Sequence, residues 1–84
     1  MYEVILNRHA SKVLNRMTPK ARERTIEMLG SLKKEPLQGK RLHGELEGLL
    51  SLRFGVERIV YEVDHKQKVV IIHGIGPRGD IYKK

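Results

Sequence analysis

Arginine side chains in the C-terminal half of the chain could bind a phosphate group. Arg53 and Arg58 lie in two segments in which large apolar residues alternate with other residues, and Arg78 follows a third apolar segment. The guanidinium group is a planar fork of donors that matches two phosphate oxygens at once. It does not deprotonate at accessible pH, so it can stabilise negative charge but cannot accept a proton. These residues indicate a phosphate-binding surface.

Strand periodicity predicts that two of these arginines share one face of a sheet. Residues 49–54 and 58–63 alternate with the period of two that is typical of half-buried strands. Large apolar side chains form one face, which we expect helices to cover: Leu50, Leu52, Phe54, Ile59, Tyr61 and Val63. Arg53 and Arg58 fall on the opposite face, in adjacent strands.

A third strand, 69–72, is predicted to bring the last arginine to the same face. Arg78 follows this strand in the parity of Val70 and Ile72. Glu62 is the only obvious acidic partner on that face, and a cluster of like charges costs stability unless an anion binds. The alternative is that each arginine pairs with one of four other acids: Glu45, Glu47, Glu57 or Asp80.

A strand and two helices are predicted to precede these strands. Residues 2–6 form the strand, which ends at Asn7, a good N-cap residue. Apolar residues then recur at helical spacing, and they are Ala10, Val13, Leu14 and Met17. Thr18 and Pro19 start a second helix, because threonine caps and proline is tolerated at the first helical position. This helix runs to about Lys34, shortly before a proline.

The predicted fold class is α+β. It consists of an N-terminal strand, an antiparallel two-helix hairpin and a three-stranded antiparallel meander, forming one sheet with the helices on one face. Residues 35–48 carry three glycines and no sustained period, which predicts a long loop that is either functional or a plain connection. Gly74, Gly76 and Pro77 are expected to end the last strand. We expect residues 1–84 to form a single domain.

Composition limits the classes of protein that fit. Seventeen Lys and Arg residues against ten Asp and Glu give a net charge of +7, which favours a polyanionic partner or simply a well-solvated surface. The chain has no cysteine, so neither a disulfide framework nor a thiolate zinc site is available. No signal peptide is recognisable, and no stretch approaches the ~20 apolar residues of a membrane span. We therefore expect a soluble, cytoplasmic protein.

Spacing argues against a metal ion and a phosphate-binding loop. The four histidines share no metal-ligand spacing. His9 and His65 read as surface residues, and His73 reads as a structural side chain in the helix-facing layer. Gly74 and Gly76 follow a strand, but no helix opens after them to hold a phosphate at its N-terminus. We expect no metal and no cofactor.

The chain resembles the RelE/ParE toxin superfamily along essentially its whole length. The resemblance lies in the runs Leu46–Gly55 (LEGLLSLRFG), Arg58–Val63 (RIVYEV) and Ile75–Tyr82 (IGPRGDIY). The opening strand, the Thr-Pro helix start and the proline before the long loop also fit. Each motif is short, but their order and spacing together are specific.

The resemblance implies a toxin of a type II toxin–antitoxin system. RelE-type members enter the ribosomal A site and cleave mRNA by attack of the adjacent 2′-OH, without a metal ion. Family catalytic positions correspond here to Arg58, Arg78 and Tyr82, and Arg53 corresponds to a common family arginine on the same face. The arginines would support phosphate charge, and Tyr82 would stack on a base or transfer a proton. The implied partners are the ribosome, mRNA and an acidic RelB-like antitoxin in a hetero-oligomer.

The chain departs from the family at the groups that transfer protons. The best-known RelE enzymes carry lysines on the strand before Arg53, where this chain has Leu49 and Ser51. Family members often have a histidine where this chain has Pro77. The strand therefore offers no obvious general base.

Residues of the long loop could replace the missing groups. Lys40, Arg41, His43 and Glu45 are the candidates. Only His43 among them titrates near neutrality when unperturbed, so it is the candidate for proton transfer. We expect Lys40, Arg41 and Ser51 to contact RNA phosphates together with Arg53.

Three functions remain open. The first is a ribosome-dependent mRNA endonuclease, which the retained Arg58, Arg78 and Tyr82 favour. The second is a ParE-like inhibitor of DNA gyrase, which the missing lysines favour. The third is a catalytically weakened toxin that acts only as an antitoxin-binding co-repressor. Basic helices around apolar seams suit an acidic, amphipathic antitoxin segment that folds on binding.

Overall fold

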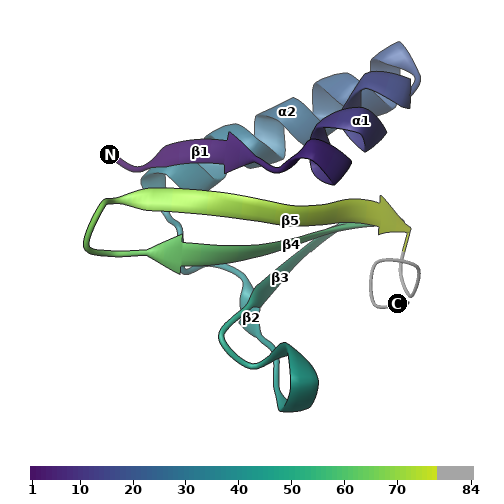
Figure 1. Cartoon of the computed structure of the whole chain (residues 1–84). Coiled ribbons are helices and arrows are strands. Elements are labelled where there is room, and N and C mark those ends of the chain that lie inside the picture. Colours follow the sequence, from purple (N-terminus) through teal and green to yellow (C-terminus); the bar gives the residue numbers. More distant parts are fainter. Residues whose placement is uncertain (78–84) are drawn as a thin grey trace.

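A mixed five-stranded sheet carries both α-helices on one of its faces (Figure 1). The computed structural model describes residues 1–77. The elements in chain order are β1 (Glu3–Leu6), α1 (Arg8–Arg16), α2 (Pro19–Lys34), β2 (Lys40–Arg41), the 3-10 helix η1 (Gly44–Leu46), β3 (Leu50–Phe54), β4 (Glu57–Asp64) and β5 (Val69–Pro77). Within this part of the chain, no helix is long and apolar enough to cross a membrane.

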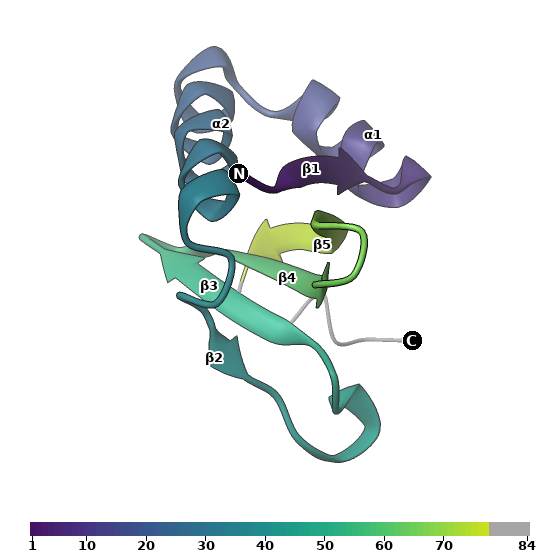
Figure 2. The same ribbon diagram turned by 90° about the vertical axis from the view of Figure 1, so that its left-hand side faces the viewer.

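The strand order across the sheet is β1-β5-β4-β3-β2. β1 runs parallel to β5, while every other neighbouring pair is antiparallel. The predicted α+β class, the helical hairpin and the antiparallel meander of β3, β4 and β5 are confirmed. The order also places β1 and β2 at the two edges of the sheet, as Figure 2 shows.

Both helices begin at the predicted caps. The Asn7 side-chain oxygen accepts a hydrogen bond from the Ala10 N–H at 2.8 Å, and its amide nitrogen donates to the His73 carbonyl at 3.1 Å. The Thr18 hydroxyl accepts a hydrogen bond from the Ala21 N–H at 3.4 Å. Thr18 directly precedes Pro19, the first residue of α2. Asn7 therefore caps α1 and also joins its start to β5.

The core lies between the helices and the sheet. Its fully buried apolar side chains come from α1, α2, β4 and β5, and they are Ala10, Leu32, Ile59, Tyr61, Val70 and Ile72. Leu50, Ile59 and Tyr61 of the predicted helix-covered face belong to this cluster, with Leu52, Phe54 and Val63 packed against it. The prediction of which strand residues face the helices is thus confirmed for β3 and β4.

The segment 35–48 is not a structureless loop, so that prediction is wrong. It contains β2 and η1, and β2 pairs with β3. A two-residue strand is too short to give a periodic signal in the sequence. The predicted end of the last strand is also wrong, because Gly74 and Gly76 remain in the ladder opposite Val60 and Arg58.

A bulge in β5 changes the alternation of its side chains. Tyr61 pairs with Ile72, but the preceding Val60 pairs with Gly74, so His73 is an extra residue. Before the bulge, Val70 and Ile72 are fully buried against the helices. The prediction that they share a face with the arginines is therefore wrong.

The same bulge moves His73 out of the helix-facing layer where it was predicted. Its Nε2 atom lies 2.6 Å from Oε1 of Glu62, and the two side chains are 39% and 42% exposed. Glu62 lies on the face opposite Tyr61, since adjacent strand residues point to opposite faces. His73 therefore reaches the open face of the sheet, because an extra residue shifts the alternation by one position.

Replacing Asn7 with alanine is expected to lower the free energy of unfolding by about 1–2 kcal/mol, because the helix loses its cap and the His73 carbonyl loses its donor. Urea denaturation followed by circular dichroism measures this change. Asn15→Ala, at an exposed position of the same helix, is the matched control and should change stability little. An unchanged free energy of unfolding in Asn7→Ala would contradict the capping role.

Tyr61 combines core packing with one polar contact. Its side chain is fully buried, and its hydroxyl oxygen accepts a hydrogen bond from the Gly39 N–H at 2.9 Å. Burial raises the pKa of Tyr61 above its usual value, and the hydrogen bond from Gly39 opposes this rise. The folded protein therefore holds the phenol proton more tightly than the unfolded chain does.

The raised pKa of Tyr61 predicts a loss of stability at high pH. Below the pKa of tyrosine in the unfolded chain, about 10, Tyr61 makes a constant contribution to the free energy of unfolding. This contribution falls as pH rises through the pKa of Tyr61 in the folded protein, since the unfolded chain releases the proton first. Urea denaturation of the wild type and Tyr61→Phe at about pH 8 and pH 10.5 tests this. The stability advantage of the wild type, about 1 kcal/mol at pH 8, should shrink at the higher pH. A constant difference would contradict it.

Candidate nucleic-acid interface

Two arginines lie directly opposite each other on the open face of the sheet. Arg53 of β3 is the register partner of Arg58 of β4. Residues opposed in this way have Cβ atoms about 4.5–5.5 Å apart, and like charges at such positions repel. Arg53 is exposed, whereas Arg58 is half-buried and its Nε atom is shielded from solvent. The predicted placement of both arginines on one face is therefore observed.

The short strand β2 adds a third cation to this face. Lys40 pairs with Ser51, and Ser51 pairs in turn with Val60 of β4. Lys40 and Ser51 therefore point to the same side as the two arginines, since side chains of paired residues share a face. Arg41 is next along the chain and pairs with Leu50, so its side chain points to the other face of the sheet.

These residues line an open cleft of about 400 Å³, formed by β2, the residues that follow it, β3 and the start of β4. The lining residues are Lys40, Arg41, Leu42, His43, Ser51, Arg53 and Arg58. Six of the predicted site residues thus come together in one place, from three separate strands and a loop. Leu42 is the member that the sequence did not indicate.

The cleft is strongly basic. Four of its lining residues are Lys or Arg, and its lining within residues 1–77 includes no carboxylate. Glu62, the acid predicted to partner the arginines, pairs instead with His73. Arg53 forms no ion pair with any acid in the described part of the chain, which disfavours the alternative in which it is neutralised internally. Asp80, another proposed partner, lies outside the described residues.

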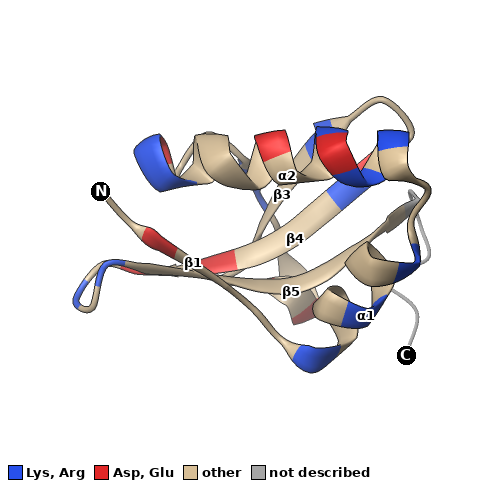
Figure 3. Cartoon of the chain, turned by 90° about the horizontal axis from the view of Figure 1, so that it is seen from above, with Lys and Arg blue, Asp and Glu red and all other residues tan. Residues whose placement is uncertain are grey.

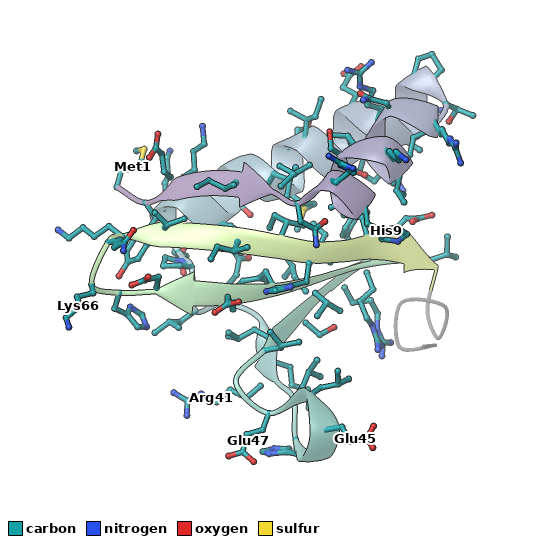
Figure 4. All side chains as sticks on the ribbon, in the orientation of Figure 1. Met1, His9, Arg41, Glu45, Glu47 and Lys66 are labelled. Atoms are coloured by element: carbon teal, nitrogen blue, oxygen red, sulfur yellow. The ribbon has the colours of Figure 1, made fainter. Side chains whose placement is uncertain are left out.

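The loop acids lie away from the cleft lining. Figure 4 shows Glu45 and Glu47 on the segment between β2 and β3, below the rest of the sheet in this view. Glu47 lines a different cavity of about 330 Å³, together with Arg41, His43 and His65. Arg41 and His43 therefore line both cavities, the basic cleft and a second one whose lining includes four leucines.

Among the predicted proton-transfer groups, His43 lies in the cleft. It is exposed and precedes η1, so its ring is accessible to a bound molecule. Arg78 and Tyr82, the other predicted catalytic residues, lie outside the described residues. Within residues 1–77, no three His, Asp or Glu side chains are close enough together to hold a metal ion.

Two of the remaining histidines, His65 and His73, have side-chain contacts. His65 is exposed in the β4–β5 turn, and its Nδ1 lies 2.8 Å from the Tyr2 hydroxyl. His9 is exposed on α1. The pair of His73 and Glu62 was missed, because only the bulge in β5 brings the two side chains together.

Comparison with known proteins finds relatives that match this chain over nearly its full length. No family model matches the sequence. The chain is 34% identical over 85 residues to Toxin RelG of Mycobacterium tuberculosis, covering 99% of this chain and 98% of that protein. The structure matches a chain of the toxin–antitoxin complex RelBE2 of the same organism with a TM-score of 0.86 and 33% identity, covering 92% of this chain and 98% of that one. An archaeal RelE–RelB complex from Pyrococcus horikoshii matches with a TM-score of 0.75 and 28% identity, covering 93% and 96%.

The helical hairpin on a mixed five-stranded sheet is the fold of RelE-like toxins, which are small α+β proteins of toxin–antitoxin pairs. The chain belongs to the RelE/ParE toxin superfamily. It is homologous to toxins of RelBE-type toxin–antitoxin systems.

Arg53→Gln is expected to weaken binding of a single-stranded RNA oligonucleotide. The slope of log affinity against log salt concentration should become shallower by about 0.7, because one phosphate contact is lost. Fluorescence anisotropy between roughly 50 and 200 mM salt measures this slope. Lys66→Gln also removes one positive charge, but from the β4–β5 turn, at the opposite end of β4 from Arg58 (Figure 4). This control variant should leave the slope nearly unchanged. Equal changes in both would assign binding to net charge.

Proposed function

We propose that the protein is the toxin of a type II toxin–antitoxin system and that it cleaves mRNA on the ribosome. The observation that carries this proposal is the basic cleft, in which Arg53 and Arg58 are register partners and Lys40 lies on the same face. Positive charges held this close favour a ligand that supplies several negative charges along its length, as the backbone of RNA does.

The proposed reaction needs no group outside the RNA as nucleophile. The 2′-oxygen of one ribose attacks the adjacent phosphorus, the P–O2′ bond forms, and the P–O5′ bond breaks. The products are a 2′,3′-cyclic phosphate and a free 5′-hydroxyl. Negative charge grows on the non-bridging oxygens during this step, and donors placed there lower the barrier. Arg53 and Arg58 supply such donors.

Proton transfer requires two further groups. One accepts the 2′-OH proton and the other gives a proton to the leaving 5′-oxygen. Neutral imidazole can accept a proton near neutral pH, so His43 is the proposed base. Its position in the lining of the cleft supports this role. Tyr82 is the proposed acid or stacking residue on the basis of family resemblance.

The proposed protein partner is an acidic antitoxin. The related RelE and RelBE2 structures are complexes with antitoxins, which supports such a partner here. Three exposed cations of α1 are spaced four residues apart on one helix face, and they are Arg8, Lys12 and Arg16. Figure 3 shows Lys and Arg at both ends of α2, with acidic residues also on this helix. This surface suits an acidic segment.

Purified protein added to a translating ribosome–mRNA complex is expected to cut the mRNA in the A-site codon, which primer extension maps. Arg58→Gln should lower the cleavage rate by about 10²–10³-fold, because a donor to the phosphate charge is lost. Arg78→Ala should likewise abolish the cuts. Lys66→Gln is the charge-matched control and should cut at the wild-type rate.

Three outcomes separate the functions. Wild-type cuts that end in a 2′,3′-cyclic phosphate support the proposal. An absence of cuts together with inhibited DNA gyrase supercoiling would assign the protein to the ParE-like activity, which the leucine and serine at positions 49 and 51 favour. An absence of both activities, with tight antitoxin binding, would leave a binding-only role.

A further inference from the structure

Tyr61 connects the core to the strand that lines the cleft. Its fully buried side chain points to the helix-covered face, away from Arg58. Its hydroxyl oxygen nevertheless accepts a hydrogen bond from the N–H of Gly39, 22 residues earlier in the chain. Gly39 directly precedes Lys40, the first residue of β2. One hydrogen bond thus ties the centre of β4 to the start of β2.

The space around Gly39 is closed by the same residue. A Cβ atom on Gly39 would lie 2.5 Å from the Tyr61 hydroxyl oxygen and 3.0 Å from the carbonyl oxygen of Ser51. The backbone at Gly39 is therefore held between β4 and β3, with no room for a side chain. The preceding Gln38 is attached to α2, because its side-chain nitrogen donates to the Ser31 hydroxyl at 3.1 Å.

β2 depends on such an attachment because it is short and lies at the edge of the sheet. Two residue pairs, Lys40 with Ser51 and Arg41 with Leu50, join it to β3. Beyond them the Leu42 N–H donates to a backbone carbonyl of the same hairpin. Short edge segments with few buried contacts open most readily.

The register of β2 decides which cation enters the cleft. With the observed pairing, Lys40 shares a face with Ser51, Arg53 and Arg58. A slip by one residue would turn Lys40 to the other face of the sheet, because side chains alternate with a period of two. The hydrogen bond to Gly39 opposes this slip, since it fixes the residue before the strand.

We propose that Tyr61 is a positioning residue that fixes the register of β2 and thereby holds Lys40 at the RNA cleft. This inference rests on the proposed RNA-cleaving function. Tyr61 itself touches no substrate in this role. It acts from the opposite face of the sheet, through Gly39 and the backbone of β2.

Tyr61→Phe retains the buried ring and removes the hydroxyl, so it isolates the hydrogen bond. In the ribosome cleavage assay we expect KM to rise about three- to tenfold, because the binding contact of Lys40 weakens. The fall in kcat should be smaller, because Arg53 and Arg58 stay in place and only His43, which follows β2, moves with it. Val70→Ala is the control, since it removes packing from a fully buried position of β5 that does not contact β2. It should lower the melting temperature without raising KM.

A double-mutant cycle separates positioning from a general loss of stability. In a Lys40→Gln background, Tyr61→Phe should cause no further rise in KM, because the residue it positions no longer carries charge. An undiminished effect of Tyr61→Phe in that background would overturn the proposal. So would a rise in KM for Val70→Ala that equals the rise for Tyr61→Phe.

Gly39→Ala perturbs the same contact from the other side. Its Cβ atom must displace the Tyr61 hydroxyl or the β3 backbone, so KM should rise as in Tyr61→Phe. Combining the two substitutions should raise KM by less than the product of the single effects, because the closest clash is then absent. Multiplicative effects would show that the two residues act independently.

Amide hydrogen exchange gives a readout that does not require catalysis. The Leu42 N–H, which donates to the Leu49 carbonyl at 2.9 Å, should exchange faster in Tyr61→Phe than in the wild type. Unchanged exchange at Leu42 would overturn the positioning role even if the wild type cleaves mRNA. Faster exchange in Tyr61→Phe, together with a wild type that cuts no mRNA, would leave the register role standing and reject the RNA function.

Discussion

Repulsion between two guanidinium groups on adjacent strands is the constraint on which the site depends. Arg53 and Arg58 are register partners, and like charges in that arrangement oppose strand pairing. Burial on the opposite face offsets this cost, because Leu52 and Ile59 are register partners one position along the same strands and belong to the packed layer. Burial of apolar side chains on one face of the sheet therefore allows two neighbouring positive charges on the other face.

The helices contribute to the site although they lie on the other side of the sheet. Leu29 and Leu32 of α2 belong to the same core cluster as Leu50 of β3 and Ile59 of β4, and the Asn7 cap joins α1 to the bulged part of β5. The bulge affects two charged residues on the open face, Glu62 and Arg58. It directs His73 toward Glu62, and it brings Gly76 opposite Arg58.

Relatives at 34% and 33% identity share this fold over nearly the whole chain. Such similarity agrees with a core that tolerates exchange among apolar residues while the pattern of buried and exposed positions persists. The cleft has different requirements, because its charges depend on register. The contact between Tyr61 and Gly39 illustrates this dependence, since it joins a core side chain to the backbone of the edge strand.

Local chemistry and short periodicities were enough to predict the helix caps at Asn7 and Thr18, the helix-covered face of β3 and β4, and the shared face of Arg53 and Arg58. The pairing of β2, the bulge at His73 and the partner of Glu62 could be read only from the folded protein. Each of these depends on backbone pairing between segments distant in the chain. A two-residue strand and a single extra residue leave no periodic signal, so the gathering of Lys40 and Ser51 beside the arginines became visible only in the folded sheet.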